Sequence, residues 1–181
     1  MFDKDRITIR NAVAADTDAI MKIENESFLP GIREDRDLYL KRISVFPEGF
    51  LVARDNLTQE TGGYIVSEIW REDLSVFPEK LALGHSPEGL HDRNGRFLYI
   101  ASFGTLRQWR GRGVGKALFQ SLQERIAKEF PSVTGQVLIV SENWTAARTL
   151  YRREGFKETG YIDGFFKPEG APAERAIIMK K

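Results

Sequence analysis

The sequence contains no cysteine and only two histidines among its 181 residues. Without cysteine there is no disulfide framework, no thiolate nucleophile and no zinc site with cysteine ligands. Two histidines are too few for a histidine-rich metal centre, so we expect no bound metal. Apolar runs are also short, and none approaches the roughly 20 residues that a membrane-spanning helix needs. The function must therefore rest on other side chains and on the backbone.

The chain has almost no net charge, since 27 lysines and arginines face 26 aspartates and glutamates, which leaves +1. This balance argues against a general nucleic-acid binder, because such proteins carry a wide basic face. A local nucleic-acid site stays open as an alternative on one basic cluster, made of Arg107, Arg110, Arg112 and Lys116.

The opening residues, MFDKDR, are too polar for a signal peptide. We therefore expect a soluble cytoplasmic protein that binds neither nucleic acid nor membrane. The sequence shows no internal repeat and no low-complexity tract, and its length suits one domain over residues 1–181.

A glycine-rich basic stretch, LRQWRGRGVGKAL, runs from Leu106 to Leu118. The apolar run Phe97–Phe103 before it predicts a strand, and apolar residues spaced four apart after it predict an amphipathic helix. The first amides of a helix lack intrahelical partners and carry partial positive charge. Glycine lets a backbone approach a ligand closely, and arginine and lysine add full charge. This combination is typical of a pyrophosphate site.

The spacing of these glycines does not fit the common nucleotide loops. There is no G-x-x-x-x-G-K-[ST], and GRGVG is too tight for G-x-G-x-x-G. The stretch from Arg110 to Gly115 instead resembles the acyl-CoA signature of the GNAT superfamily of N-acetyltransferases, Arg/Gln-x-x-Gly-x-Gly/Ala.

A second segment resembles the other GNAT hallmark, Asn-x-x-Ala-x-x-Leu-Tyr-x-x-x-Gly-Phe. The pairs Leu150-Tyr151 and Gly155-Phe156 match in place. The asparagine of the hallmark falls on Trp144, and a one-residue shift in the loop would bring Asn143 to that position.

The order of predicted elements also resembles this family over nearly the whole chain. The resemblance implies an α/β (α+β) fold of three layers, with a mixed, mostly antiparallel sheet of about seven strands and helices on both faces. The expected strands cover residues 7–13, 50–53, 64–70, 97–106, 136–140, 157–164 and 176–179. The expected helices start at Asp16 or Thr17, cover 35–43 and 114–130, and end before Gly155.

The family resemblance implies transfer of an acetyl group from acetyl-CoA to a primary amine on a small molecule or a protein. The amine would attack directly, which agrees with the lack of cysteine and of a G-x-S-x-G elbow. Tyr151 would donate a proton to the leaving thiolate, although a core tyrosine is the alternative. The implied cofactor-binding residues are Phe103, Gly104, Thr105, Leu106, Arg110, Gly111, Arg112, Gly113, Val114, Gly115, Lys116, Asn143 and Tyr151.

No general base is assigned, because the strand before the glycine turn carries neither carboxylate nor histidine. A relay through ordered water is one alternative. Glutamates on helices are usually solvated, and we interpret Glu24, Glu26 and Glu34 in this way. The other candidates, each more typical of a structural or solvated residue, are Glu142, His85, His91, Glu24 and Asp163.

Several questions about the acceptor stay open. The irregular stretch 71–96 is either a lid over the acceptor or a surface excursion with local helix. The segments 46–52 and 85–89 resemble bacterial relatives of arylalkylamine acetyltransferases. The pair Phe165-Phe166 either packs on the core or resembles the paired tyrosines of protein N-terminal acetyltransferases.

Two further alternatives concern the function class and assembly. The same fold could bind acyl-CoA without catalysis, as a sensor or an interaction module. A homodimer could form if the final strand lay at a sheet edge and paired between protomers.

Overall fold

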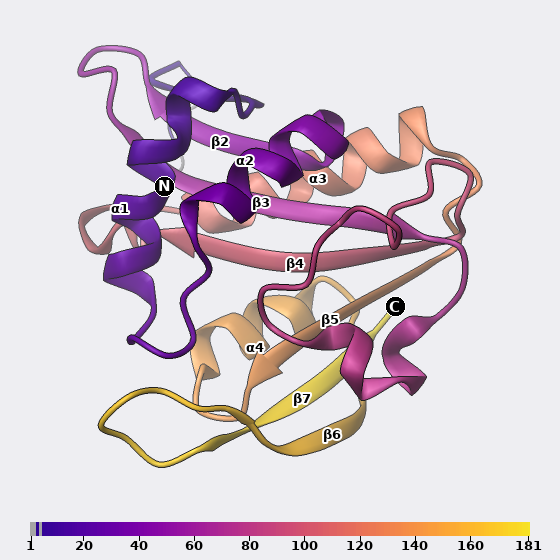
Figure 1. The fold of residues 1–181 in the computed structure, drawn as a ribbon. Coiled ribbons are helices and arrows are strands. Elements are labelled where there is room, and N and C mark those ends of the chain that lie inside the picture. The colour runs from indigo at the N-terminus through magenta and orange to yellow at the C-terminus, as the bar shows by residue number, and fades with distance from the viewer. Residues whose placement is uncertain (1–2, 4) are drawn as a thin grey trace.

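The computed structural model describes residue 3 and residues 5–181. Met1, Phe2 and Lys4, part of the polar opening segment, lie outside the described residues. One seven-stranded sheet runs through the molecule in the order β1-β2-β3-β4-β5-β7-β6 (Figure 1). All neighbours are antiparallel except β4 and β5, which are parallel. The strands are β1 (Ile7–Asn11), β2 (Phe50–Asp55), β3 (Thr61–Trp70), β4 (Phe97–Thr105), β5 (Gly135–Ser141), β6 (Lys157–Phe166) and β7 (Glu174–Lys180).

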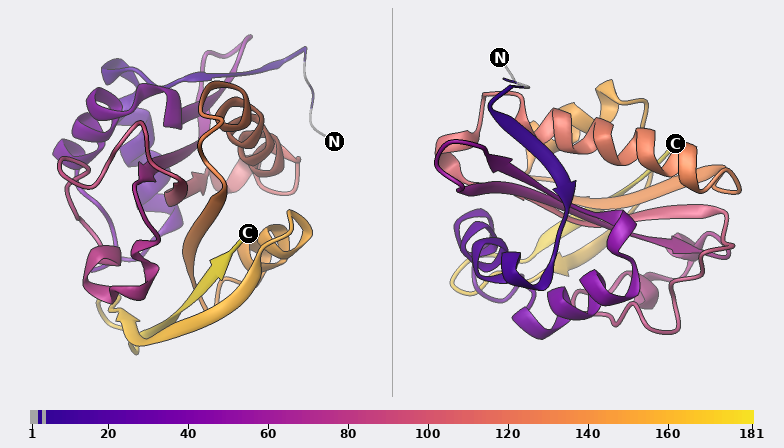
Figure 2. Two further views of the ribbon diagram at one scale, coloured as in Figure 1. Left: turned by 90° about the vertical axis from the view of Figure 1, so that its right-hand side faces the viewer. Right: turned by 90° about the horizontal axis from the view of Figure 1, so that it is seen from above.

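Helices cover both faces of this sheet (Figure 2). One face carries α1 (Thr17–Ser27), α2 (Arg36–Val45) and the segment 71–96, and the other carries α3 (Val114–Glu129) and α4 (Thr145–Arg153). The expected three-layer fold with a mixed, mostly antiparallel sheet is therefore confirmed. The short 3-10 helices are η1 (Ala14–Asp16), η2 (Pro47–Gly49), η3 (Leu74–Val76), η4 (Pro78–Leu81) and η5 (Arg107–Trp109).

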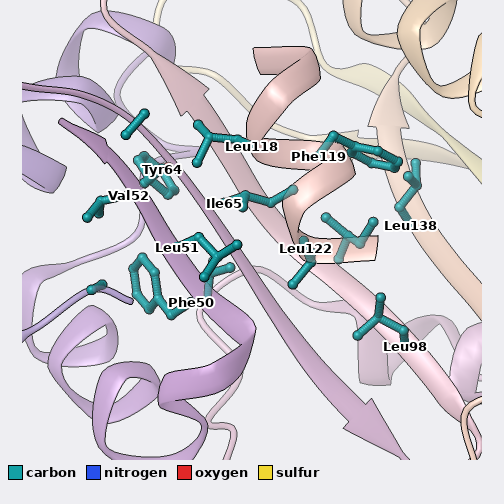
Figure 3. Packing of buried hydrophobic residues seen from close by; sticks show 14 of the residues in the cluster. Phe50, Leu51, Val52, Tyr64, Ile65, Leu98, Leu118, Phe119, Leu122 and Leu138 are labelled. Carbon is teal, nitrogen blue, oxygen red and sulfur yellow. The ribbon is translucent and has the colours of Figure 1, made fainter. Parts of the chain in front are cut away.

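The main core lies between α3 and the sheet. The apolar residues spaced four apart turn one face of α3 inward, and Leu118 and Leu122 are fully buried there. They belong to the same apolar cluster as Leu51 of β2 and Ile65 of β3 (Figure 3). Burial of this stripe fixes α3, and with it the position of the glycine turn that precedes the helix.

The two parallel strands, β4 and β5, separate midway along the sheet. They pair from Phe97 opposite Gly135 to Ile100 opposite Leu138, and no further. Beyond this point β4 is bonded only to β3, while β5 is bonded only to β7. On the β3 side the register shifts so that Ala101 is an extra residue in β4. Such a bulge bends a strand and increases its twist, which turns β4 away from β5.

Two of the three glutamates interpreted as solvated are buried, so that interpretation is wrong for them. Glu24 is 1% exposed and Glu34 is 7% exposed, whereas Glu26 is exposed as expected. Glu24 lies one helical turn after the buried Ile20, on the inner side of α1. Tyrosine hydroxyls donate to its carboxylate there and compensate its burial. Asp16 does lie at the start of α1, but its side chain pairs with Arg10 instead of capping the helix.

The C-terminal strands also differ from what the sequence analysis assumed. The final strand β7 lies between β5 and β6, so the edges of the sheet are β1 and β6. The premise of a dimer through the final strand therefore fails. Strand β6 also runs two residues beyond the expected 157–164 and ends with Phe165 and Phe166, because it continues to pair with β7 as far as Phe166 opposite Glu174.

No helix over residue 3 and residues 5–181 is long and apolar enough to cross a membrane. Within the same residues, no group of three or more histidines, aspartates and glutamates is placed to hold a metal ion.

Truncation of the α3 stripe tests the core. Leu122→Ala removes a fully buried side chain and should lower the free energy of unfolding by about 2–5 kcal/mol. Urea denaturation measures this loss. The exposed Glu124→Ala on the same helix is the control and should stay within about 0.5 kcal/mol of the parent. Equal stability of the two variants would contradict the packing described.

Candidate active site

A cavity of about 590 Å³ opens where β4 and β5 separate. Its walls come from the end of α1, the second half of β4, the glycine turn with the start of α3, and one side of α4. Segments far apart in the sequence therefore meet at the splayed strands. The predicted cofactor-binding residues in the walls are Phe103, Gly104, Thr105, Arg110, Gly111, Gly113, Val114, Gly115, Lys116, Asn143 and Tyr151.

Two predicted residues do not line the cavity. Leu106 is 1% exposed and belongs to the apolar core, because its amide pairs with the carbonyl of Gly62 at 2.9 Å and turns the residue inward. Arg112 is exposed and lies outside the walls. The prediction was too broad at these two positions, since a contiguous motif does not show which side chains face inward.

The glycine turn has the backbone that its composition predicts. Gly111 and Gly113 have φ values of +72° and +84°, in the left-handed region that other residues rarely adopt. Gly113 caps α3, so the amides of Val114, Gly115 and Lys116 have no partners within the helix. These amides, the helix dipole and the Lys116 side chain place positive potential at this end of the cavity.

The second half of β4 presents a free backbone edge to the cavity. One edge of residues 102–105 pairs with β3. The other edge is not paired with a strand, because β5 pairs with β4 only as far as Ile100. Gly104 lies here because α1 packs closely: a Cβ atom would lie 3.0 Å from Ile23 Cγ2 and 3.1 Å from Ser27 Oγ. An extended ligand can add to such an edge as a strand does.

Tyr151 reaches the cavity from α4. Its ring is 6% exposed and packs against Phe119 and Phe156, with ring centroids 5.6 Å and 6.2 Å away. Among the described residues none is hydrogen-bonded to its hydroxyl. Burial raises the pKa of Tyr151, so the phenol is protonated at neutral pH and can donate. Nearby, Asn143 lines the rim, one residue before the Trp144 N-cap of α4.

The walls of the cavity also contain an acidic cluster that the sequence analysis did not assemble. Glu24 and Ser102 both line the walls. Glu24 Oε2 accepts hydrogen bonds from the hydroxyls of Tyr39, at 2.9 Å, and Tyr64, while Oε1 accepts from the amide of Glu34 at 2.9 Å. The Ser102 hydroxyl lies 2.9 Å from that of Tyr64. Ser102 is the one serine within the largely apolar β4 sequence, and this was the signal that could have revealed it.

A second charged network lies behind this cluster. Arg42 is 1% exposed and pairs with Glu34, and its Nε lies 3.7 Å from Glu68. Burial, the largest single effect, would lower the pKa of Arg42, but the charge and hydrogen bond of Glu34 together with the charge of Glu68 raise the pKa. His85 Nε2 lies 3.0 Å from Glu68, and the amide of Gly84 donates to Glu34 at 3.2 Å. These contacts attach the segment 71–96 to the wall, to which it contributes Leu83.

Of the five candidate bases, Glu24 lines the cavity and the others do not. His85 pairs with Glu68, and the ring of His91 accepts from the amide of Ile69 at 3.1 Å. Glu142 accepts from the amide of Arg175, and Asp163 pairs with the Arg175 side chain.

The sequence also matches a known family. A family model described as an acetyltransferase (GNAT) domain matches residues 47–158, which include both the glycine turn and Tyr151. The chain belongs to the GNAT family of acetyltransferases. The resemblance seen in the sequence is thereby confirmed, and with it an enzyme of the acyltransferase class. No curated protein matches the chain.

Solved structures of this GNAT fold cover nearly the whole chain. The GNAT-like decarboxylase GphF, in complex with isobutyryl-CoA, is 20% identical with a TM-score of 0.74 and covers 96% of this chain and 97% of its own. The ribosomal-protein-S18-alanine N-acetyltransferase of Escherichia coli is 18% identical (TM-score 0.67; 96% and 92% covered). A phosphinothricin acetyltransferase of Sinorhizobium meliloti, in complex with acetyl-CoA, is 22% identical (TM-score 0.69; 97% and 88% covered).

The two histidines allow a direct test of the charged network. Burial alone would lower the pKa of His85, but the hydrogen bond and charge of Glu68 outweigh it and raise the pKa above the ordinary 6.5. Burial lowers the pKa of His91. NMR titration of the imidazole resonances should therefore show one pKa on each side of 6.5. The His85–Glu68 pair should stabilise the fold fully below pH 6.5 and lose this effect as pH rises through the raised pKa.

The matched variants are Glu68→Gln and Glu88→Gln. The first should lower the pKa of His85, because it removes the paired carboxylate. Glu88→Gln changes an exposed carboxylate in the segment 71–96, which also contains His85, and should leave the His85 pKa unchanged. A His85 pKa below 6.5 in the parent protein would show that the pair does not form.

Proposed function

We propose that this GNAT enzyme transfers an acetyl group from acetyl-CoA to a primary amine by direct attack of the amine on the thioester. The observation that carries the proposal is the cavity between the splayed strands. It brings a pyrophosphate-type turn, a free strand edge and a protonated tyrosine into one site.

The residues of the cavity suit acetyl-CoA in two ways. The amides that start α3, with Lys116, would hold the pyrophosphate, and Arg110 stays at the rim through its bond to the carbonyl of Thr105 at 3.2 Å. The pantetheine arm would pair with the free edge of β4 around Phe103 and Gly104. The thioester would then lie between β4 and β5, within reach of α4.

The chemistry asks two things of the protein besides binding. The leaving sulfur needs a proton, and Tyr151 is placed in the wall with a hydroxyl that has no other partner among the described residues. The acceptor must enter from the α1 side, because α3 and α4 cover the donor side. We call this α1 side the acceptor end of the cavity.

The acceptor is an amine of a small molecule or of a protein, and both alternatives stay open. Three aromatic side chains form part of the wall, with Trp144 between Phe28 and Phe166 at centroid distances of 5.1 Å and 5.0 Å. They support an acceptor that carries an apolar group near its amine. A non-catalytic acyl-CoA sensor is the alternative function, and it predicts acetyl-CoA binding without release of CoA to any amine.

Calorimetric titration with acetyl-CoA tests the donor site. Gly113→Glu adds a carboxylate beside the pyrophosphate and a side chain at φ +84°, so affinity should fall at least tenfold, or about 1.4 kcal/mol. Gly89→Glu is the control: it has the same substitution at φ +88° in open space, away from the cavity, and should bind like the parent. A parent protein that binds no acetyl-CoA would refute the donor site.

Replacement of the tyrosine hydroxyl tests its role. Tyr151→Phe keeps the ring packed against Phe119 and removes only the proton donor, so kcat should fall by about 100-fold while acetyl-CoA affinity is kept. CoA release across an amine panel can be followed with a thiol reagent, since the chain has no cysteine of its own.

The matched control for this variant is Tyr161→Phe on β6. Tyr161 is 60% exposed and lies outside the cavity walls, so its turnover should equal that of the parent. Unchanged turnover in Tyr151→Phe would exclude the hydroxyl from the reaction.

A further inference from the structure

A cluster of four side chains at the acceptor end has no part in the steps above. Glu24 comes from α1, Tyr39 from α2, Tyr64 from β3 and Ser102 from β4. Glu24 and Ser102 line the cavity, and both tyrosines are fully buried behind them. Four separate elements thus converge to connect the cavity with a buried carboxylate.

Hydrogen counting shows that this cluster has room for another proton. Three hydroxyl groups supply three hydrogens while the carboxylate is ionised. Five oxygen–oxygen contacts are close enough for hydrogen bonds, so two of them lack a hydrogen, and an arriving proton would fill one. The contacts join Glu24 to Tyr39 (2.9 Å) and Tyr64, Tyr39 to Tyr64 (2.9 Å), and Ser102 to Tyr64 (2.9 Å) and Tyr39 (3.3 Å).

The hydrogens of this cluster also have a direction. Tyr64 donates to Glu24, so the 2.9 Å contact between Tyr64 and Ser102 can only be filled by the serine hydrogen. The lone pairs of Ser102 are then left for a donor in the cavity. An ammonium group is such a donor.

Glu24 has no cationic partner among the described residues, in contrast to Glu34, which pairs with Arg42. An isolated buried carboxylate is unfavourable, and a proton or an approaching ammonium relieves this cost. The titratable groups packed against Glu24 are Tyr39 and Tyr64, together with the nearby carboxylate of Glu34. Burial, the largest effect, and the charge of Glu34 raise the pKa of Glu24.

We propose that Glu24 takes up the proton that the acceptor ammonium must lose, by way of the hydroxyls of Ser102 and Tyr64. The inference rests on the proposed acetyl transfer to an amine. It assigns the missing base to a helix, whereas the strand before the glycine turn carries no carboxylate.

The proton moves in three linked transfers. The ammonium gives a proton to Ser102 Oγ, the serine hydroxyl gives its own to Tyr64, and Tyr64 gives its own to Glu24 Oε2. The nitrogen keeps its electron pair, which forms the new C–N bond while the C–S bond breaks.

The remaining protons then balance. The departing sulfur takes the proton of Tyr151, and a second proton from the nitrogen restores Tyr151 through solvent. Glu24 releases its proton to solvent before the next turnover. One ammonium and one thioester thus give one amide, one thiol and one free proton.

The experiment is the pH profile of kcat/KM for Glu24→Gln. The probes are acetyl-CoA and whichever of 2-phenylethylamine, cadaverine and an alanine-initiated peptide the parent acetylates fastest. Glutamine keeps an acceptor for the tyrosines but cannot take a proton. At neutral pH kcat/KM should fall about 100-fold, and it should recover as pH rises, with a slope of about one in log units, because free amine replaces ammonium.

Interruption of the path gives a second reading of the same step. Ser102→Ala and Tyr64→Phe leave Glu24 in place and should show the same loss, recovered at high pH. Glu26→Gln, the same substitution at an exposed position of α1, should follow the parent profile. A merely structural role would lower activity equally at every pH.

The outcomes separate this inference from the proposed function. A parent-like profile in Glu24→Gln, or in both path variants if Glu24→Gln does not fold, overturns the inference and leaves acetyl transfer standing. A parent protein that binds acetyl-CoA but acetylates none of the probes refutes the proposed function, and the inference falls with it.

Discussion

The site depends on the limited pairing between β4 and β5. Four residue pairs join them, from Phe97–Gly135 to Ile100–Leu138, and the extra residue Ala101 then bends β4 away. The sheet therefore consists of two smaller sheets, one formed by β1, β2, β3 and β4 and the other by β5, β7 and β6. One short parallel contact joins them. Because α3 is packed on the first and α4 lies beside the opening, the bend brings the ends of both helices to one cavity (Figure 1).

Charge is distributed unevenly along this cavity. The glycine turn supplies unpaired amides, a helix dipole and Lys116 to one part of the walls, while another part has the buried carboxylate of Glu24. Glu34 adds to this negative charge only in part, because it is paired with Arg42. A polyanionic ligand would thus be drawn to the glycine turn and a cationic group to Glu24.

The fold was largely predictable because its signals are local. The fourfold spacing in α3, the glycines with positive φ and the hairpin of β2 and β3 each follow from a few neighbouring residues. The acidic end was not predictable in this way. Glu24 becomes a cavity residue only because Tyr39 and Tyr64 arrive from distant elements and compensate its burial. In sequence it is one more helical glutamate, and helical glutamates are usually solvated.

Interior placement of the β4 edge has a consequence for the behaviour of the protein in concentrated solution. Unpaired strand edges on a protein surface recruit strands of other chains and promote aggregation. Here the unpaired edge of β4 lies in a cavity whose walls also include Trp144 and Leu150 of the α4 region. The unpaired part of β4 is therefore enclosed by the walls of the cavity, while the outer edges of the sheet are formed by β1 and β6.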